Sequence, residues 1–193
     1  MLVLAIDTSL DACSVALVRG DAVLAELSEP MQRGQAERLA PMAQEVIAAA
    51  GVSFAQLDRI AVTTGPGSFT GVRVGLSFAR ALALALGKPC VGVSTLEALA
   101  LAEGQAGLRA ALIETPGAAY FALYQDGAAR VTPQNIERGA HEALTPAGAL
   151  LIGPEVRVSA PALARYASTL DPARYAPDPA YLRAPHVTLP GAS

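Results

Sequence analysis

Histidine is scarce in this sequence. His141 and His186 are the two that occur, far apart and in polar or proline-rich surroundings, and neither belongs to an HxxxH or HExxH pair. Paired histidines of that kind are the usual basis of a zinc or iron site. We therefore expect two surface histidines and no metal site.

Cysteine and charge are also sparse. Cys13 and Cys90 both lie in apolar, strand-like segments, which favours two buried, reduced thiols. Charged residues make up 16% of the 193 residues, and the net charge is −3. A protein that binds nucleic acid alone usually carries a basic surface. If RNA is involved, we expect a partner to supply most of the positive charge.

Leader and membrane signals are missing as well. The apolar start 2–6 reaches Asp7 at once, without a basic segment before it. The longest apolar stretch, 72–86, is short for a membrane span and includes Arg73 and Arg80. We expect a cytoplasmic protein that does not enter a membrane.

Hydrophobic runs and turn residues predict an α/β fold in the first half of the chain. Three strands are expected first, at 2–6, 13–18 and 22–27. Alternating elements follow: a helix over 35–50, a strand over 59–63, a helix over 69–86, a strand over 90–93 and a helix over 95–103. For the last helix, Ser94 and Glu97 fit a capping box. A meander followed by alternating units is the ribonuclease-H-like order, which the actin-like ATPases also use.

After 104–107 the pattern restarts in a shorter form. Strands are expected at 109–113, 120–125, 128–132 and 149–152, and helices over 137–144 and 160–168. The sequence thus predicts two lobes, the second one reduced, followed by an extended proline-rich tail. The predicted bounds are 1–105, 106–169 and 170–193.

The turn VTTGPGSFTGVR (62–73) joins a strand to a helix and raises the question of a phosphate site. Free N–H groups at a helix start suit an anion. However, Val72 follows Gly71 where a P-loop needs lysine, and Thr70 stands where a dinucleotide motif needs glycine. A bound phosphate and a turn that only starts a helix are both left open. The residues that would lie near a phosphate or nucleotide are Asp7, Thr8, Ser9, Gly65, Gly67, Ser68, Thr70 and Gly71.

Asp7, at the end of the first strand, allows more than one interpretation. A ribonuclease-H-type nuclease holds two metal ions with carboxylates, one of them at the end of the fourth strand. Here that position carries Thr63 and Thr64, so a nuclease is not expected. Asp7 either lies near a nucleotide or accepts hydrogen bonds from N–H groups of its own turn.

The helix expected over 69–86 is apolar on two sides. At 100° per residue, Val74, Phe78 and Leu82 mark a side that we assign to the sheet. Because one helix on one sheet needs a single apolar face, the second side should meet the helix 35–50, another subunit, or both; complete burial within its own lobe is the alternative. The predicted interface residues are Leu39, Met42, Ala43, Val46, Val72, Arg73, Leu76, Ala79, Arg80 and Ala83.

Four stretches of the sequence resemble the TsaB family, formerly called YeaZ. They are VLAIDTSLDACSVAL, RGQAERLAPMAQEVI, VTTGPGSFTGVRVGLSFARALALALGKPCVGVSTLEALA and PAYLR. The resemblance covers the first lobe almost completely, and GPGSFTGVR and GVSTLEALA are highly specific. It implies the actin-like ATPase fold with two lobes.

The resemblance also implies a function. TsaB proteins are partners of TsaD, a paralogue that does the chemistry, and of the ATPase TsaE. Together these proteins attach a threonylcarbamoyl group to the N6 of adenosine beside the tRNA anticodon. By this resemblance the chain is a non-catalytic subunit that pairs with TsaD, forms a homodimer when alone, and meets tRNA only through the complex. No cofactor is expected apart from weakly bound ATP or ADP at the subunit junction.

The residues agree with a non-catalytic role. In TsaD a metal is held by an HxxxH pair just after the fifth strand, and the matching positions here are Thr95 and Leu99. The chain departs from the family pattern at Gln35, often histidine, and at Glu114-Thr115-Pro116. The alternative function is a nucleotide-binding ATPase of the actin-like class that acts on its own, based on Asp7 and the turn at 65–71.

Overall fold

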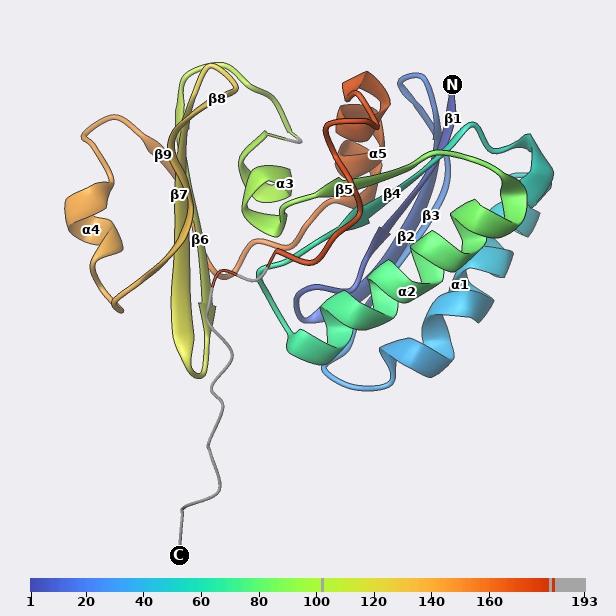
Figure 1. The fold of residues 1–193 in the computed structure, drawn as a ribbon, viewed down its shortest axis with the longest axis horizontal. Coiled ribbons are helices and arrows are strands. Elements are labelled where there is room, and N and C mark those ends of the chain that lie inside the picture. Colours follow the sequence, from blue (N-terminus) through green and yellow to red (C-terminus); the bar gives the residue numbers. More distant parts are fainter. Residues whose placement is uncertain (102, 181, 183–193) are drawn as a thin grey trace, which may run out of the picture.

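Two β-sheets stand on either side of a pair of helices (Figure 1). The computed structural model describes residues 1–101, 103–180 and 182. Two further helices cover the outer face of the first sheet, and a short one lies outside the second. The helices are α1 (Gln35–Ala49), α2 (Phe69–Leu86), α3 (Thr95–Leu101), α4 (His141–Leu144) and α5 (Ala160–Thr169).

The first sheet has the strand order β3-β2-β1-β4-β5. Ala5 of the central strand lies opposite Ala16 in an antiparallel pair and opposite Ala61 in a parallel one. This central strand is buried along its whole length, as an unbroken apolar run predicts. The strands are β1 (Leu2–Asp7), β2 (Ala12–Arg19), β3 (Ala22–Pro30), β4 (Arg59–Thr63) and β5 (Cys90–Val93).

The second sheet repeats this arrangement with one strand fewer among the described residues. Its order is β8-β7-β6-β9, so β9 corresponds to β4 and no described strand takes the place of β5. The strands are β6 (Leu108–Thr115), β7 (Ala118–Gln125), β8 (Ala128–Ile136) and β9 (Leu150–Ile152). The α/β, actin-like order predicted from the sequence is confirmed, with a smaller second half.

The predicted helices and strands are all present, and most bounds agree closely. The largest differences are that β8 continues to Ile136 and that α4 begins only at His141. A 3-10 turn, η1 (Phe54–Gln56), was not predicted. The capping box expected at Ser94 is wrong, because the Ser94 hydroxyl has no hydrogen-bond partner among the described residues.

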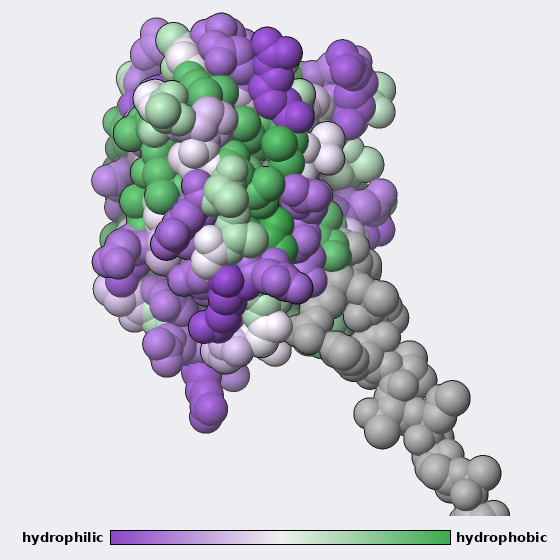
Figure 2. Space-filling model, turned by 90° about the vertical axis from the view of Figure 1, so that its left-hand side faces the viewer, coloured by the Kyte–Doolittle hydropathy of each residue, from purple (hydrophilic) through white to green (hydrophobic). Residues whose placement is uncertain are grey.

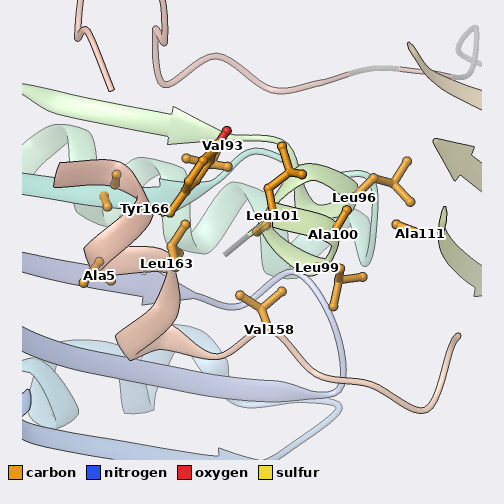
Figure 3. Close-up of a cluster of buried hydrophobic side chains, with 14 of the residues drawn as sticks. Ala5, Val93, Leu96, Leu99, Ala100, Leu101, Ala111, Val158, Leu163 and Tyr166 are labelled. Atoms are coloured by element: carbon orange, nitrogen blue, oxygen red, sulfur yellow. The ribbon is translucent and has the colours of Figure 1, made fainter. Parts of the chain in front are cut away.

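Helices α3 and α5 form the layer between the sheets and are exchanged between the two halves. α3 follows the first sheet in the chain but packs on β6 and β7, whereas α5 follows the second sheet but packs on β1 and β2. Figure 3 shows their buried side chains filling the space between the sheets, where Leu163 of α5 and Leu96 of α3 are fully covered. One contiguous core therefore holds the two sheets together.

A buried arginine ties the end of α5 to the first sheet. Nη1 of Arg59, the first residue of β4, donates to the carbonyl oxygens of Ala167 at 2.5 Å and Leu170 at 2.7 Å. Carbonyl groups at a helix end have no partner within the helix, so a guanidinium is a suitable donor for them. Arg59 thereby fixes the point at which the chain leaves α5.

The first part of the segment predicted as an extended proline-rich tail over 170–193 packs on the first sheet. Residues 171–180, here called the C-terminal strap, run past β5 toward the turn that precedes α2 (Figure 1). The Gly92 N–H donates to the Tyr175 carbonyl oxygen at 3.0 Å, and the Ala180 N–H donates to the Thr64 carbonyl oxygen at 2.9 Å. The last part of the predicted tail, 183–193, lies outside the described residues.

The second half has an apolar outer surface, and α2 is an unusually apolar helix. Figure 2 shows apolar side chains gathered on the outer face of the second half. Leu150 and Leu151 of β9 are both exposed. By length and composition alone, α2 is the one described helix that could cross a membrane. Because α2 packs on β4 and beside α1 in a continuous core, we interpret it as a helix of the globular fold.

Candidate functional site

The turn after β1 is the first part of the candidate site, and Asp7 forms its centre. Oδ1 of Asp7 accepts hydrogen bonds from the Ser9 hydroxyl at 2.5 Å, the Thr63 hydroxyl at 2.6 Å and the Ser9 N–H at 3.1 Å. The side chain is buried. Burial raises the pKa of the Asp7 carboxyl, and the hydrogen bonds from Ser9 and Thr63 oppose that shift only in part.

This geometry decides between the interpretations of Asp7. Its carboxyl group is occupied by its own turn and by the end of β4, and it is closed off from the surface. Thr63, where a nuclease would place a second carboxylate, is a hydrogen-bond donor to Asp7. Asp7 therefore stabilises the turn and the β1–β4 contact.

The glycine turn packs directly against the turn after β1. The Ser68 N–H donates to the Ser9 carbonyl oxygen at 2.7 Å, and the Thr8 hydroxyl donates to the Gly71 carbonyl oxygen at 2.7 Å. A Cβ added at Gly67 or Gly71 would overlap the carbonyl oxygen of Ser9 or Thr8. These glycines are thus required by a close approach of two backbone segments.

The start of α2 already uses several of its donors within the chain. The Ser68 hydroxyl accepts from the Gly71 N–H at 3.2 Å, and the Val72 N–H donates to the Ser68 carbonyl oxygen. Ser68 is thus an N-cap, and its oxygen takes the position at which an anion would bind a helix start. Gly65 is buried, while Thr70 is exposed on the outer side. The geometry favours a helix-starting turn over a phosphate cradle.

Most residues of the predicted interface on α1 and α2 are covered by the chain itself. Eight of its ten residues are buried within this single chain, and only two of the ten, Arg73 and Arg80, are exposed. The eight buried residues are Leu39, Met42, Ala43, Val46, Val72, Leu76, Ala79 and Ala83. These eight side chains therefore offer little surface of their own, and the interface on α1 and α2 stays a prediction.

The two faces of α2 are the reverse of the prediction. The face with Gly71, Gly75 and Ala79 lies on the sheet, and a Cβ at Gly75 would come within 2.5 Å of the Thr8 hydroxyl oxygen. Val74 and Phe78, assigned to the sheet, are half-exposed. The reason is size, because small residues let the helix come close enough to touch the turn after β1.

An apolar groove remains on the outer side, between α1 and α2. It has a volume of about 490 Å³ and is lined by residues of both helices. Phe69 is 62% exposed at one end, and the Arg73 guanidinium lies over its ring, 3.6 Å from the centroid. The lining residues are Ala36, Leu39, Phe69, Thr70, Arg73, Val74, Ser77 and Phe78.

A second hollow lies between the two halves of the molecule, next to the glycine turn. Its volume is about 710 Å³. Three carboxylates line it, on Asp11, Glu114 and Glu155, against one guanidinium, on Arg157. This balance of charge disfavours the phosphates of a nucleotide.

Metal-ligating side chains do not gather in the described part of the chain. Within 1–101, 103–180 and 182 there is no group of three or more His, Cys, Asp or Glu residues that could hold an ion. Thr95 and Leu99, which the family resemblance matches to the TsaD histidine pair, are both buried on α3.

Comparison with known proteins gives the family. The family model for TsaD, described as tRNA N6-adenosine threonylcarbamoyltransferase, matches residues 27–187. The tRNA threonylcarbamoyladenosine biosynthesis protein TsaB of Escherichia coli is 40% identical over 129 residues. The chain belongs to the TsaB (YeaZ) family. The aligned part is 65% of this chain and 55% of the E. coli protein.

A solved structure agrees with this family and with the fold. YeaZ from Pseudomonas aeruginosa superposes with a TM-score of 0.76 at 28% identity, covering 94% of this chain and 99% of that one. The actin-like arrangement seen in the sheet order is thus shared with a TsaB (YeaZ) protein over nearly the whole chain.

The matches cover only part of each curated relative, and one of the relatives is named as a transferase. The chain spans about half the length of the curated relatives it matches, with 55% of the E. coli TsaB and 42% of the Haemophilus influenzae TsaB covered. In addition, a tRNA N6-adenosine threonylcarbamoyltransferase of Erythrobacter litoralis is 42% identical over 116 residues, covering 52% of this chain and 34% of that protein.

Sequence reasoning found the glycine turn but missed the groove and the strap. The groove residues Phe69 and Phe78 are the two aromatic residues of α2, and these were the available signal. For the strap, the sequence held a weaker signal, which is the glycine at position 92 inside β5.

The close approach at Gly71 can be tested by substitution. Gly71→Ala should lower the free energy of unfolding by about 3 kcal/mol, because the new Cβ would collide with a backbone carbonyl. A glycine that only started a helix would give the opposite sign, since alanine is favoured there by about 1 kcal/mol. Urea unfolding followed by circular dichroism distinguishes the two. Gly153→Ala is the control, because a Cβ there meets nothing within 4 Å, and it should change stability by less than about 1 kcal/mol.

The buried carboxyl of Asp7 predicts a pH dependence. Its pKa in the folded chain is raised above the usual 3.8, so the folded chain holds this proton more tightly than the unfolded one. Its contribution to stability is full below about pH 3.8 and is lost as the pH rises through the folded pKa. Relative to Asp7→Asn, the wild-type chain should therefore lose unfolding free energy across that window. Urea titrations of both proteins at a series of pH values measure this, and a relative gain by the wild type would contradict it.

Proposed function

We propose that this chain is a non-catalytic subunit that pairs with TsaD, works with TsaE, and takes part in forming threonylcarbamoyladenosine in tRNA. Membership of the TsaB (YeaZ) family supports this, together with the name of the E. coli relative. The observation that carries the pairing is the apolar groove between α1 and α2.

The groove has the properties of a protein-binding surface. Apolar and aromatic side chains line it, and Arg73 and Ser77 add polar groups at its border. Phe69 with Arg73 over its ring provides an exposed aromatic and a cation side by side, a combination common in the energetic centres of interfaces. When the chain is alone, the same groove would pair two copies of it.

Several features support a role without chemistry. The Asp7 carboxyl is enclosed, the glycine turn is filled by the turn after β1, and Thr95 and Leu99 replace the histidine pair of TsaD. The alternative, an actin-like ATPase that acts alone, is based on Asp7 and the turn at 65–71. The hollow next to that turn is lined by more carboxylates than cations, which disfavours it. In the proposed partner role, any weak binding of ATP or ADP would occur at the junction with the partner subunit.

The charge of the chain fits contact with tRNA only through the complex. The net charge is −3, and basic side chains are few, so partners would supply the phosphate contacts. We place the chain in the cytoplasm, with the tRNA that the complex modifies.

Substitution in the groove tests the pairing. Ser77 is exposed on the groove wall, so Ser77→Arg should leave the fold intact and weaken binding to TsaD at least tenfold by placing a large cation there. Gln134→Arg, an exposed position on β8, is the matched control. Calorimetric titration of TsaD measures both, and equal affinities would exclude this groove. A charged residue introduced at Leu76 or Ala79 would not test the groove, because these side chains belong to the hydrophobic core.

The biological role is tested by nucleoside analysis. Depletion of the chain in its host should lower threonylcarbamoyladenosine in total tRNA, measured by mass spectrometry of digested nucleosides. The wild-type gene and Gln134→Arg should restore it, and Ser77→Arg should not. Unchanged modification after depletion would contradict the assignment.

A further inference from the structure

The C-terminal strap lies on the side of α2 opposite α1. We propose that the strap is a positioning element for α2, so that the shape of the groove between α1 and α2 depends on a segment that leaves the second half of the molecule. The link from the strap to α2 stands on contacts within the chain. Its effect on a partner rests on the function proposed above.

The strap is seated by backbone contacts at both ends of its path along β5. The Gly92 N–H donates to the Tyr175 carbonyl oxygen, and the Ala180 N–H donates to the Thr64 carbonyl oxygen, just before the glycine turn. A Cβ at Gly92 would come within 2.6 Å of the Ala176 carbonyl oxygen, of the Pro177 Cα and of the Thr64 Cγ2. The strap thus fits only over a glycine.

From this seat the strap contacts α2 and the turn that starts it. Oδ1 of Asp178 lies 3.6 Å from Nη1 of Arg80 on α2. At the other end, the Ala180 carbonyl oxygen lies beside Gly65 in the turn that starts α2, 3.8 Å from the place of a Cβ at that residue. Because an exposed ion pair contributes little, the backbone seat does most of the holding.

The opposite end of the strap is anchored in the layer between the sheets. Oε1 of Glu97 on α3 accepts from the Tyr166 hydroxyl of α5 at 2.7 Å and from the Tyr175 hydroxyl of the strap at 3.1 Å. Burial raises the pKa of both tyrosines, so they remain donors at neutral pH. One carboxylate thereby joins α3, α5 and the strap.

These contacts place α2 between two supports. α1 packs along one flank, and the strap holds the other flank near Arg80 and the helix start. If the strap leaves its seat, α2 loses the second support while the first sheet and α1 remain. Release of the strap should therefore loosen α2 and change the groove without unfolding the chain.

Gly92→Ala tests this by evicting the strap, with Gly153→Ala as the control that adds a methyl group in open space. Hydrogen–deuterium exchange with mass spectrometry on the full chain gives the readout. We expect at least tenfold faster exchange in 171–180 and in α2, with β1, β2, β6 and β7 unchanged, and wild-type exchange in the control. Faster exchange in the strap without any change in α2, or no change in either, would overturn the proposal.

A milder variant covers the case in which Gly92→Ala fails to fold. Tyr175→Phe removes the hydrogen bond to Glu97 and keeps the ring, and Tyr120→Phe is its control. The same pattern of exchange is expected at smaller amplitude, and identical exchange in both variants would overturn the proposal.

TsaD affinity of each folded variant then separates the two hypotheses. Loosened α2 with weaker TsaD binding supports both. Loosened α2 with unchanged TsaD binding supports the strap and counts against the groove as the pairing surface.

Discussion

The contact between the turn after β1 and the glycine face of α2 is the constraint on which the rest of the structure depends. Carbonyl oxygens of Thr8 and Ser9 occupy the space that Cβ atoms would need at Gly71 and Gly67. This contact sets which side of α2 is buried, and the outer groove is what is left over.

The helices are divided between the two faces of the first sheet. α2 joins α1 on the outer face of the first sheet, whereas α3 and α5 fill the inner layer. Chemistry-bearing side chains in this core, such as Asp7, Arg59 and Glu97, are all engaged with neighbours inside the chain.

Much of the fold was readable in the sequence, because strands such as β1 and β4 are short apolar runs bounded by turn residues. The orientation of α2 was not, since both of its sides are apolar and periodicity alone cannot rank them. The deciding partner, Thr8, lies about 60 residues away in the chain and acts through its hydroxyl as well as its backbone carbonyl. The strap escaped prediction for a similar reason, because N–H and carbonyl groups are present in nearly every residue and leave no signature.

The exchange of α3 and α5 has a consequence for how the molecule can be divided. A cut near residue 105 would follow the sheets, but each fragment would carry the helix that seals the other. Neither piece could then close its own hydrophobic surface, and the pieces would have to find each other again to become folded. The two sheets are therefore separate in topology but not in folding, and the chain has to be expressed or engineered with both sheets and both exchanged helices together.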